Sequence, residues 1–154
     1  ALKVIVSGGD PASGGPTRAA PEGRAAELGL AVAPRFTGVV DDPAAYLAAM
    51  DIQVMPSRRE GLGLVAGEGM LAGCAVIGSA VDGIPEIVID GVTGLLVPPE
   101  NPEALAEAID RLIANPDLRR RLAAKGEERV RDIHSPLRFD SDLLAVVEQL
   151  LASR

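Results

Sequence analysis

Short apolar stretches alternate with helical patterns along the first two thirds of the chain. Aliphatic and β-branched residues, bounded by Gly, Pro or Asp, predict buried strands. These stretches are residues 2–7, 32–37, 52–55, 75–78 and 94–97. The segments between them predict helices over residues 22–30, 44–50 and 64–72, and a short helical element over 84–89. This alternation predicts an α/β fold with a doubly wound parallel sheet.

Proline and asparagine mark where other segments begin. Residues 10–21 are rich in Pro, Gly and Ser and predict a loop. In the last third, Asn101-Pro102 and Asn115-Pro116 each place a capping side chain before a proline. With an apolar periodic stretch over 136–151, they predict that C-terminal helices occupy about residues 102–152.

Composition narrows the class of protein. The chain has 154 residues, the size of one domain, and 47% hydrophobic residues, enough for a core. Its net charge of −7 argues against nucleic acid as a partner. We find no apolar stretch long enough to span a bilayer and no signal peptide. A single cysteine, Cys74, fits a cytoplasmic protein.

Candidate chemistry is concentrated in residues 56–99. A loop carrying Arg58, Arg59 and Glu60 follows the third strand and leads into a helix that contains Glu68. Seven residues separate the two carboxylates. Loops at the carboxyl ends of parallel strands are where ligands bind, so this loop is the first candidate site.

Two carboxylates at this spacing are compatible with several kinds of site. A glycosidase pair needs carboxyl groups about 5–10 Å apart, which Glu60 and Glu68 could reach. A metal site has less support, because no His or third acid is close in sequence, and we expect no metal. Recognition of sugar hydroxyls fits better, since an ionised carboxylate accepts the two hydrogen bonds that a vicinal diol donates.

The glycines of the same loop add a second indication. Gly61 and Gly63 let the backbone approach a ligand, and amides just before a helix N-terminus favour an anion. Residues 61–101 contain no Lys or Arg, so an anion there depends on backbone amides, Arg58 and Arg59, or residues outside the chain. A diol and an anion together indicate a nucleotide diphosphate sugar.

A weaker phosphate-loop signal occurs near the start of the chain. Gly8-Gly9 follows the first strand, but the complete dinucleotide-binding or Walker spacing is absent. A turn explains this pair more simply, and it stays a secondary candidate.

The segment PSRREGLGLVAGEGMLAGCAVIGSAVDGIPEIVIDGVTGLLVPP resembles the E-x7-E region of retaining GT-B glycosyltransferases, the family 4 group. Residues 2–9, 35–38 and 101–122 resemble further segments of that family, so the similarity covers nearly the whole chain. The motif positions are Glu60, Gly61, Gly63, Glu68, Gly73, Glu86 and Gly94.

This resemblance implies a Rossmann-like C-terminal half of a GT-B fold and a role for each motif position. Glu60, the candidate catalytic residue, would contact hydroxyls of the transferred sugar, and Glu68 would hold the ribose of the donor. Amides of Gly61, Leu62, Gly63 and Leu64 would meet the sugar or the diphosphate. Glu86 is a further candidate, although an acid in the first turn of a short helix is also common. No metal or other cofactor is implied, and the D-x-D motif is absent.

The chain also departs from that family. Residues 1–154 resemble only the donor-nucleotide domain, and the N-terminal acceptor domain is missing, as are the Arg and Lys that contact the diphosphate. We therefore expect the isolated chain to lack transferase activity. Leu62 stands where the family usually has Phe, Gly67 and Gly69 flank Glu68, and Asp82 occupies a position often held by Gly.

Other functions remain open from the sequence. The chain fits a non-catalytic nucleotide-sugar-binding or assembly module, or a fragment of a GT-B sugar-nucleotide epimerase. The nucleotide sugar is the expected partner, and peripheral membrane association is open for the full enzyme. The apolar last helix favours self-association when the missing domain is not there to cover it.

Overall fold

The computed structural model describes residues 3–7, 19–29 and 34–152. The chain divides into two compact units, Ala1–Pro43 and Ala44–Arg154. Each unit is described by itself.

The first unit contains a parallel strand pair and a helix. β1 (Ile5–Ser7) pairs with β2 (Arg35–Gly38), and α1 (Ala19–Glu27) lies between them in sequence. The predicted loop over 10–21 is wrong in its last part, because α1 already begins at Ala19. Pro21 is in the first turn of α1, where a backbone N–H has no helical acceptor, so the proline does not interrupt the helix. Gly8 and Gly9 lie outside the described residues.

The second unit is built on a three-stranded parallel sheet. Its strands are β3 (Ile52–Met55), β4 (Ala75–Ser79) and β5 (Leu95–Val97), in the order β3-β4-β5. The helices are α2 (Pro43–Ala48), α3 (Leu64–Leu71), α4 (Ile84–Ile87), α5 (Pro102–Ala114), α6 (Pro116–Ile133) and α7 (Pro136–Ala152). Every strand pairing among the described residues is parallel, which confirms the predicted fold class.

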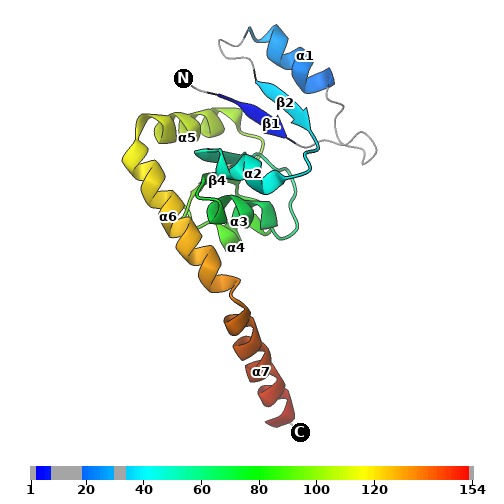
Figure 1. Cartoon of the computed structure of the whole chain (residues 1–154), viewed down its shortest axis with the longest axis vertical. Coiled ribbons are helices and arrows are strands. Elements are labelled where there is room, and N and C mark those ends of the chain that lie inside the picture. Colours follow the sequence, from blue (N-terminus) through cyan, green and yellow to red (C-terminus); the bar gives the residue numbers. More distant parts are fainter. Residues whose placement is uncertain (1–2, 8–18, 30–33, 153–154) are drawn as a thin grey trace. The chain divides into compact units, whose positions relative to one another are not determined.

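Hydrophobic clusters cover both faces of this sheet. Val76 belongs to one cluster and its neighbours Ala75 and Ile77 to the other, as expected because successive strand residues point to opposite faces. The first cluster consists of Met55, Ala66, Met70, Val76, Ile84, Ile87, Val88 and Val130. The second consists of Ala75, Ile77, Leu95, Val97, Ala108, Leu112, Leu118 and Leu122. Helix α6 (yellow to orange in Figure 1) contributes residues to both clusters and so connects the cores on the two faces of the sheet.

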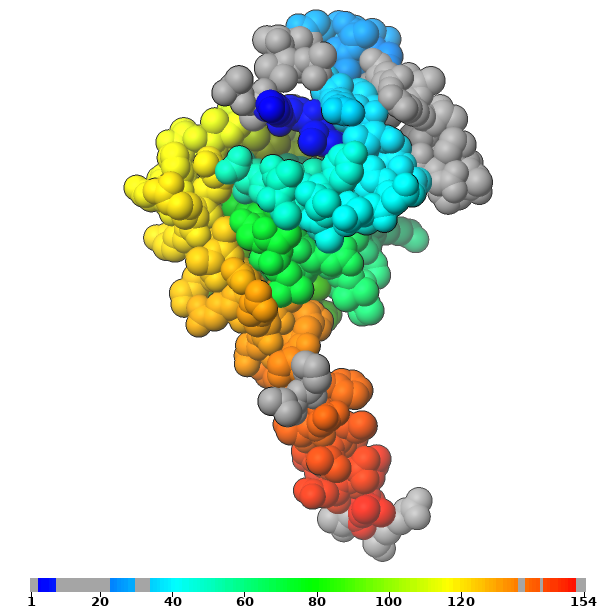
Figure 2. Space-filling view, in the orientation of Figure 1, coloured from blue at the N-terminus to red at the C-terminus, as the bar shows by residue number. Residues whose placement is uncertain are grey.

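Helices α5 and α6 have the predicted asparagine caps, and the third C-terminal helix, α7, differs from them in burial. Asn101 Oδ1 accepts a hydrogen bond from the Ala104 amide, and Asn115 Oδ1 from the Leu118 amide, each at 2.9 Å. Helix α7 keeps its apolar side chains exposed (red in Figure 2). These are Phe139, Leu143, Leu144, Val146, Val147, Leu150 and Leu151. No helix in the described part of the chain is long and apolar enough to cross a membrane.

Candidate functional site

Three loops leave the carboxyl edge of the β3-β4-β5 sheet and contact one another. They are residues 56–63, 80–83 and 98–101. The Glu60 amide donates a hydrogen bond to Asp82 Oδ2 at 2.8 Å, which joins the first two loops. Arg58 Nε lies 2.9 Å from Glu100 Oε1, which joins the first loop to the third. This edge is where open parallel sheets bind ligands.

Close backbone packing also holds the first two loops together. A Cβ atom on Gly83 would lie 2.4 Å from the Gly61 carbonyl oxygen and 2.9 Å from the Leu62 Cα. No side chain fits there, so a glycine at position 83 is what lets the loops meet.

Glu60 is half-buried, and donors of its own loop hold its carboxylate. Oε1 accepts the Gly61 amide at 3.1 Å, and the Ser57 hydroxyl lies 3.5 Å from Oε2. The Gly61 N–H, predicted to meet the ligand, is therefore directed at Glu60. A carboxylate has four lone-pair positions, so Glu60 can still accept hydrogen bonds from a ligand.

Helix α3 begins with unused hydrogen-bond donors. Gly63 has φ +68°, a left-handed conformation that favours glycine, and it directs the chain into Leu64. Among the described residues, no acceptor lies against the amides of Leu64 and Val65. Free amides at a helix N-terminus, together with the helix dipole, attract an anion.

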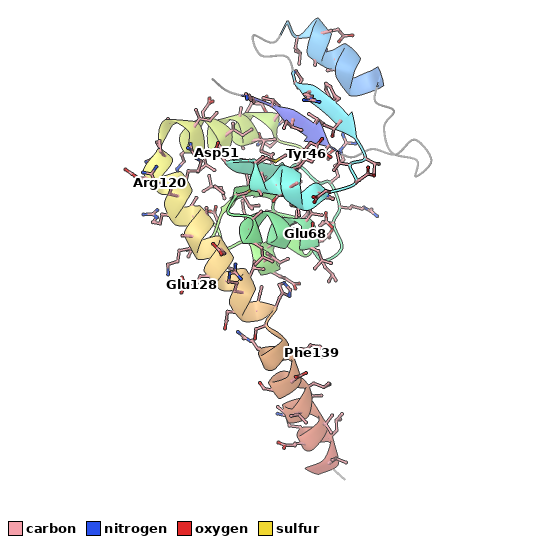
Figure 3. The ribbon with its side chains drawn as sticks, viewed as in Figure 1. Tyr46, Asp51, Glu68, Arg120, Glu128 and Phe139 are labelled. Carbon is pink, nitrogen blue, oxygen red and sulfur yellow. The ribbon has the colours of Figure 1, made fainter. Side chains whose placement is uncertain are left out.

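Glu68 projects from α3 into solvent (Figure 3). Its position four residues after Leu64 places both on the same face of the helix. The opposite face is buried and carries Ala66, Gly67, Gly69 and Met70. Among the described residues, no hydrogen bond or ion pair engages the Glu68 carboxylate, so internal partners do not sequester it.

Gln53 is a buried polar residue of β3, and the sequence pattern predicts for it no role beyond its place in the strand. Its exposure is 6%, and its Nε2 donates to the Val65 carbonyl oxygen at 3.0 Å. Its Oε1 has no hydrogen-bond partner in the described part of the chain. Gln53 therefore connects β3 to the first turn of α3. The only sign of this role in the sequence is that a side-chain amide stands within an otherwise apolar strand.

The remaining candidates lie on the same three loops or on α4. Arg58 is exposed and paired with Glu100, whereas Arg59 is exposed with no ion pair among the described residues. Glu86 is exposed on α4. The backbone carbonyl of Glu86 accepts Arg129 Nη2 at 2.7 Å, and that of Ile87 accepts Arg129 Nε at 2.9 Å. No local pattern predicts this contact, because Arg129 lies more than forty residues away on α6.

Outside these loops, burial and then the charge of Asp51 raise the pKa of the Cys74 thiol. Within the described residues, no three His, Cys, Asp or Glu side chains form a group that could hold a metal ion.

A family model described as "Glycosyl transferases group 1" matches residues 1–129. The chain belongs to this family. Among its group 1 relatives, the D-inositol 3-phosphate glycosyltransferase of Thermomonospora curvata is 41% identical over 128 residues. The match covers 80% of this chain and 29% of that protein.

Solved structures share the fold of this chain. Sucrose-phosphate synthase from Thermosynechococcus elongatus matches 99% of this chain and 39% of its own, with a TM-score of 0.82 and 38% identity. The Anabaena protein HepE, solved in complex with UDP-glucose, matches 96% of this chain and 41% of its own, with a TM-score of 0.80. At 22% identity, HepE shows the fold alone. These likenesses confirm the Rossmann-like fold of GT-B type.

Proposed function

We propose that this chain is the donor-binding part of a cytoplasmic, retaining glycosyltransferase of the family 4 group. The enzyme transfers a hexose from a nucleotide diphosphate sugar to an acceptor, without a metal. The proposal depends on one observation, which is that groups able to bind a sugar, an anion and a diol follow one another along a single segment of the chain. Glu60, open backbone at Gly61, free helix-start amides at Leu64 and Val65, and exposed Glu68 follow one another at the carboxyl edge of the sheet.

Glu68 has the properties of a diol receptor. Its carboxylate is exposed, and no described side chain competes for it. We assign it to the two ribose hydroxyls of the donor, which would each donate one hydrogen bond. A hydrogen bond to a charged group contributes about 1.5–3 kcal/mol, so the loss of Glu68 should weaken binding by roughly 10- to 100-fold for each of these bonds.

Gly61 supports the proposal through the space around it. Apart from its two chain neighbours, no described residue has an atom within 4 Å of a Cβ placed on Gly61, and the φ of Gly61 is not in the left-handed region. Neither packing nor backbone strain within the described residues explains a glycine here. We infer that the space is used by the donor, whose sugar or diphosphate would pass close to the backbone.

The chemistry assigned to this edge is binding and charge stabilisation. The free amides at the start of α3, with Arg59 nearby in sequence, would stabilise the departing diphosphate, and Glu60 would orient the hexose. Holding the donor near its reactive geometry is the main contribution of such a site.

Transfer itself requires an acceptor site. The match to the T. curvata relative covers only 29% of that protein. We propose that the 154-residue chain binds donor but does not transfer sugar, and that it lacks the arginine and lysine implied for the diphosphate. A sugar-transfer assay that gave normal turnover with this chain would contradict the proposal.

Calorimetry with nucleoside diphosphates tests the function directly. UDP comes first because the HepE structure contains UDP-glucose, and GDP and ADP complete the series. We expect one of the three to bind, and Glu68→Ala to weaken it at least about tenfold. Glu107→Ala, which removes an exposed carboxylate from α5, is the matched control and should leave binding unchanged.

Two other outcomes would favour the alternative functions. No binding by any of the three nucleotides would favour the assembly module. Release of free UDP from UDP-N-acetylglucosamine without a sugar acceptor, together with a change in sugar configuration, would favour the epimerase.

A further inference from the structure

Asp82 adopts a backbone conformation that residues with side chains seldom adopt. Its φ is +44°, in the left-handed region, where aspartate is tolerated better than most residues but glycine is favoured. It precedes Gly83 in the loop after β4, at the position where the resembled family often has glycine. A residue that keeps a side chain in such a conformation needs a compensating interaction.

The compensating interaction is a hydrogen bond to the neighbouring loop. Asp82 Oδ2 accepts the Glu60 amide at 2.8 Å, a distance typical of bonds to an ionised acceptor. A glycine at position 82 would adopt the same φ without strain but would provide no acceptor. The Asp82 side chain therefore links the loop after β4 to the loop after β3, which the backbone of residue 82 alone would not do.

Asp82 and Gly83 together contact the Glu60-Gly61 dipeptide at both ends. Asp82 accepts the N–H of Glu60, and Gly83 packs against the carbonyl oxygen of Gly61. The Glu60 side chain leaves the backbone between these two contacts along the chain, and its carboxylate accepts a hydrogen bond from the Gly61 amide. The backbone from which this carboxylate projects is thus fixed by the loop after β4.

We propose that Asp82 is a positioning residue, which orients the Glu60 carboxylate toward the donor's sugar by holding the Glu60 backbone. The inference rests on the proposed function, because it assigns the effect to the sugar. Asp82 does not act on the diphosphate, since its negative charge would repel phosphate. Its loss should therefore weaken binding of a sugar nucleotide more than binding of the nucleoside diphosphate alone.

Two variants separate the side chain from the backbone. Asp82→Gly keeps the left-handed conformation and removes the acceptor. Asp82→Asn tolerates the same φ and retains an amide oxygen that can accept the Glu60 N–H. If the hydrogen bond from the Glu60 amide holds the loop, Asp82→Asn should keep most of the amide protection and most of the sugar-nucleotide affinity that Asp82→Gly loses.

The first measurement needs no ligand. Hydrogen exchange of the Glu60 amide should accelerate at least about tenfold in Asp82→Gly relative to wild type, and much less in Asp82→Asn. Equal exchange in wild type and Asp82→Gly would show that the hydrogen bond does not restrain this loop, and would overturn the proposal.

The second measurement is calorimetry with the pairs UDP and UDP-glucose, GDP and GDP-mannose, and ADP and ADP-glucose. The gain in affinity from nucleotide to sugar nucleotide should shrink by about tenfold in Asp82→Gly, and Asp82→Asn should recover it. Equal weakening of both members of a pair indicates a general structural role and overturns the proposal, as does no change in either. If wild type binds no member of any pair, the proposed function fails and the assignment of Asp82 fails with it.

Discussion

The side-chain amide of Gln53 occupies the space that a Cβ atom on residue 69 would fill. An ideal Cβ at Gly69 would lie 1.8 Å from Gln53 Oε1 and 2.5 Å from its Cδ. A glycine within a helix costs about 0.5–1 kcal/mol relative to alanine. At position 69 this cost has a structural reason, because the glycine admits the amide that bonds the first turn of α3.

Gly69→Ala should therefore destabilise the chain. The new methyl group would displace the buried Gln53 amide and break its bond to Val65, for a net loss of roughly 1–3 kcal/mol in the free energy of unfolding. Urea unfolding measures the change. Gly67→Ala is the matched control, since its Cβ would lie 3.7 Å from Val130 Cγ1, an ordinary contact. It should be neutral or stabilising by up to about 1 kcal/mol, and equal losses in both variants would contradict this account.

Substitutions at Gly61 and Gly83 should distinguish an effect on ligand binding from an effect on folding. Gly61→Ala should change the free energy of unfolding by less than about 0.5 kcal/mol, because its Cβ meets no described atom. It should nevertheless weaken nucleotide-sugar binding, since the methyl group would enter the space assigned to the donor. Urea unfolding and calorimetry on the same preparation measure both effects, and unchanged binding would remove Gly61 from the site.

Gly83→Ala should behave in the opposite way. Its Cβ would meet backbone atoms of Gly61 and Leu62, which cannot rotate away as a side chain can. We expect a loss of roughly 1–3 kcal/mol in the free energy of unfolding, measured in urea. Unfolding indistinguishable from that of wild type would show that the first two loops are not packed as described.

The buried thiol of Cys74 predicts a pH dependence of stability. Burial and the charge of Asp51 raise its pKa in the folded chain, whereas the unfolded chain has the ordinary value of 9.0. This contribution to stability is fully present below the unfolded pKa and is lost as the pH rises toward the folded one. Between about pH 7.5 and 10, the free energy of unfolding should fall more steeply in wild type than in Cys74→Ala. If the free energy of unfolding fell equally steeply with pH in both proteins, the raised pKa of Cys74 would be contradicted.

Local patterns were sufficient to predict most of the fold. The Asn-Pro pairs at 101 and 115 specify caps through contacts three residues away, and both predicted caps are present. The apolar strands of the second unit also fall where the sequence predicts them, with ends within one residue. Residues 19–21 were wrongly predicted as loop because proline in a first helical turn has the same composition signal as proline in a loop.

Contacts between distant loops could not be predicted in this way. Arg58 was a candidate for the donor, but in the structure it pairs with Glu100, forty-two residues later. In the sequence, Asp82 is only an unusual residue at a glycine position, and its bond to Glu60 depends on how the loops after β3 and β4 pack. The sequence identifies the acids and glycines of the site, whereas the partners that fix them come from tertiary structure.

The location of a bound nucleotide tests the central claim most directly. In an amide-detected NMR titration of the 154-residue chain with UDP, GDP and ADP, one nucleotide should shift the resonances of Leu64, Val65 and Glu68 most strongly. The same titration of Glu68→Ala should give much weaker binding. Saturable shifts centred on another part of the chain, or no shifts with any of the three nucleotides, would contradict a donor site at the carboxyl edge of the β3-β4-β5 sheet.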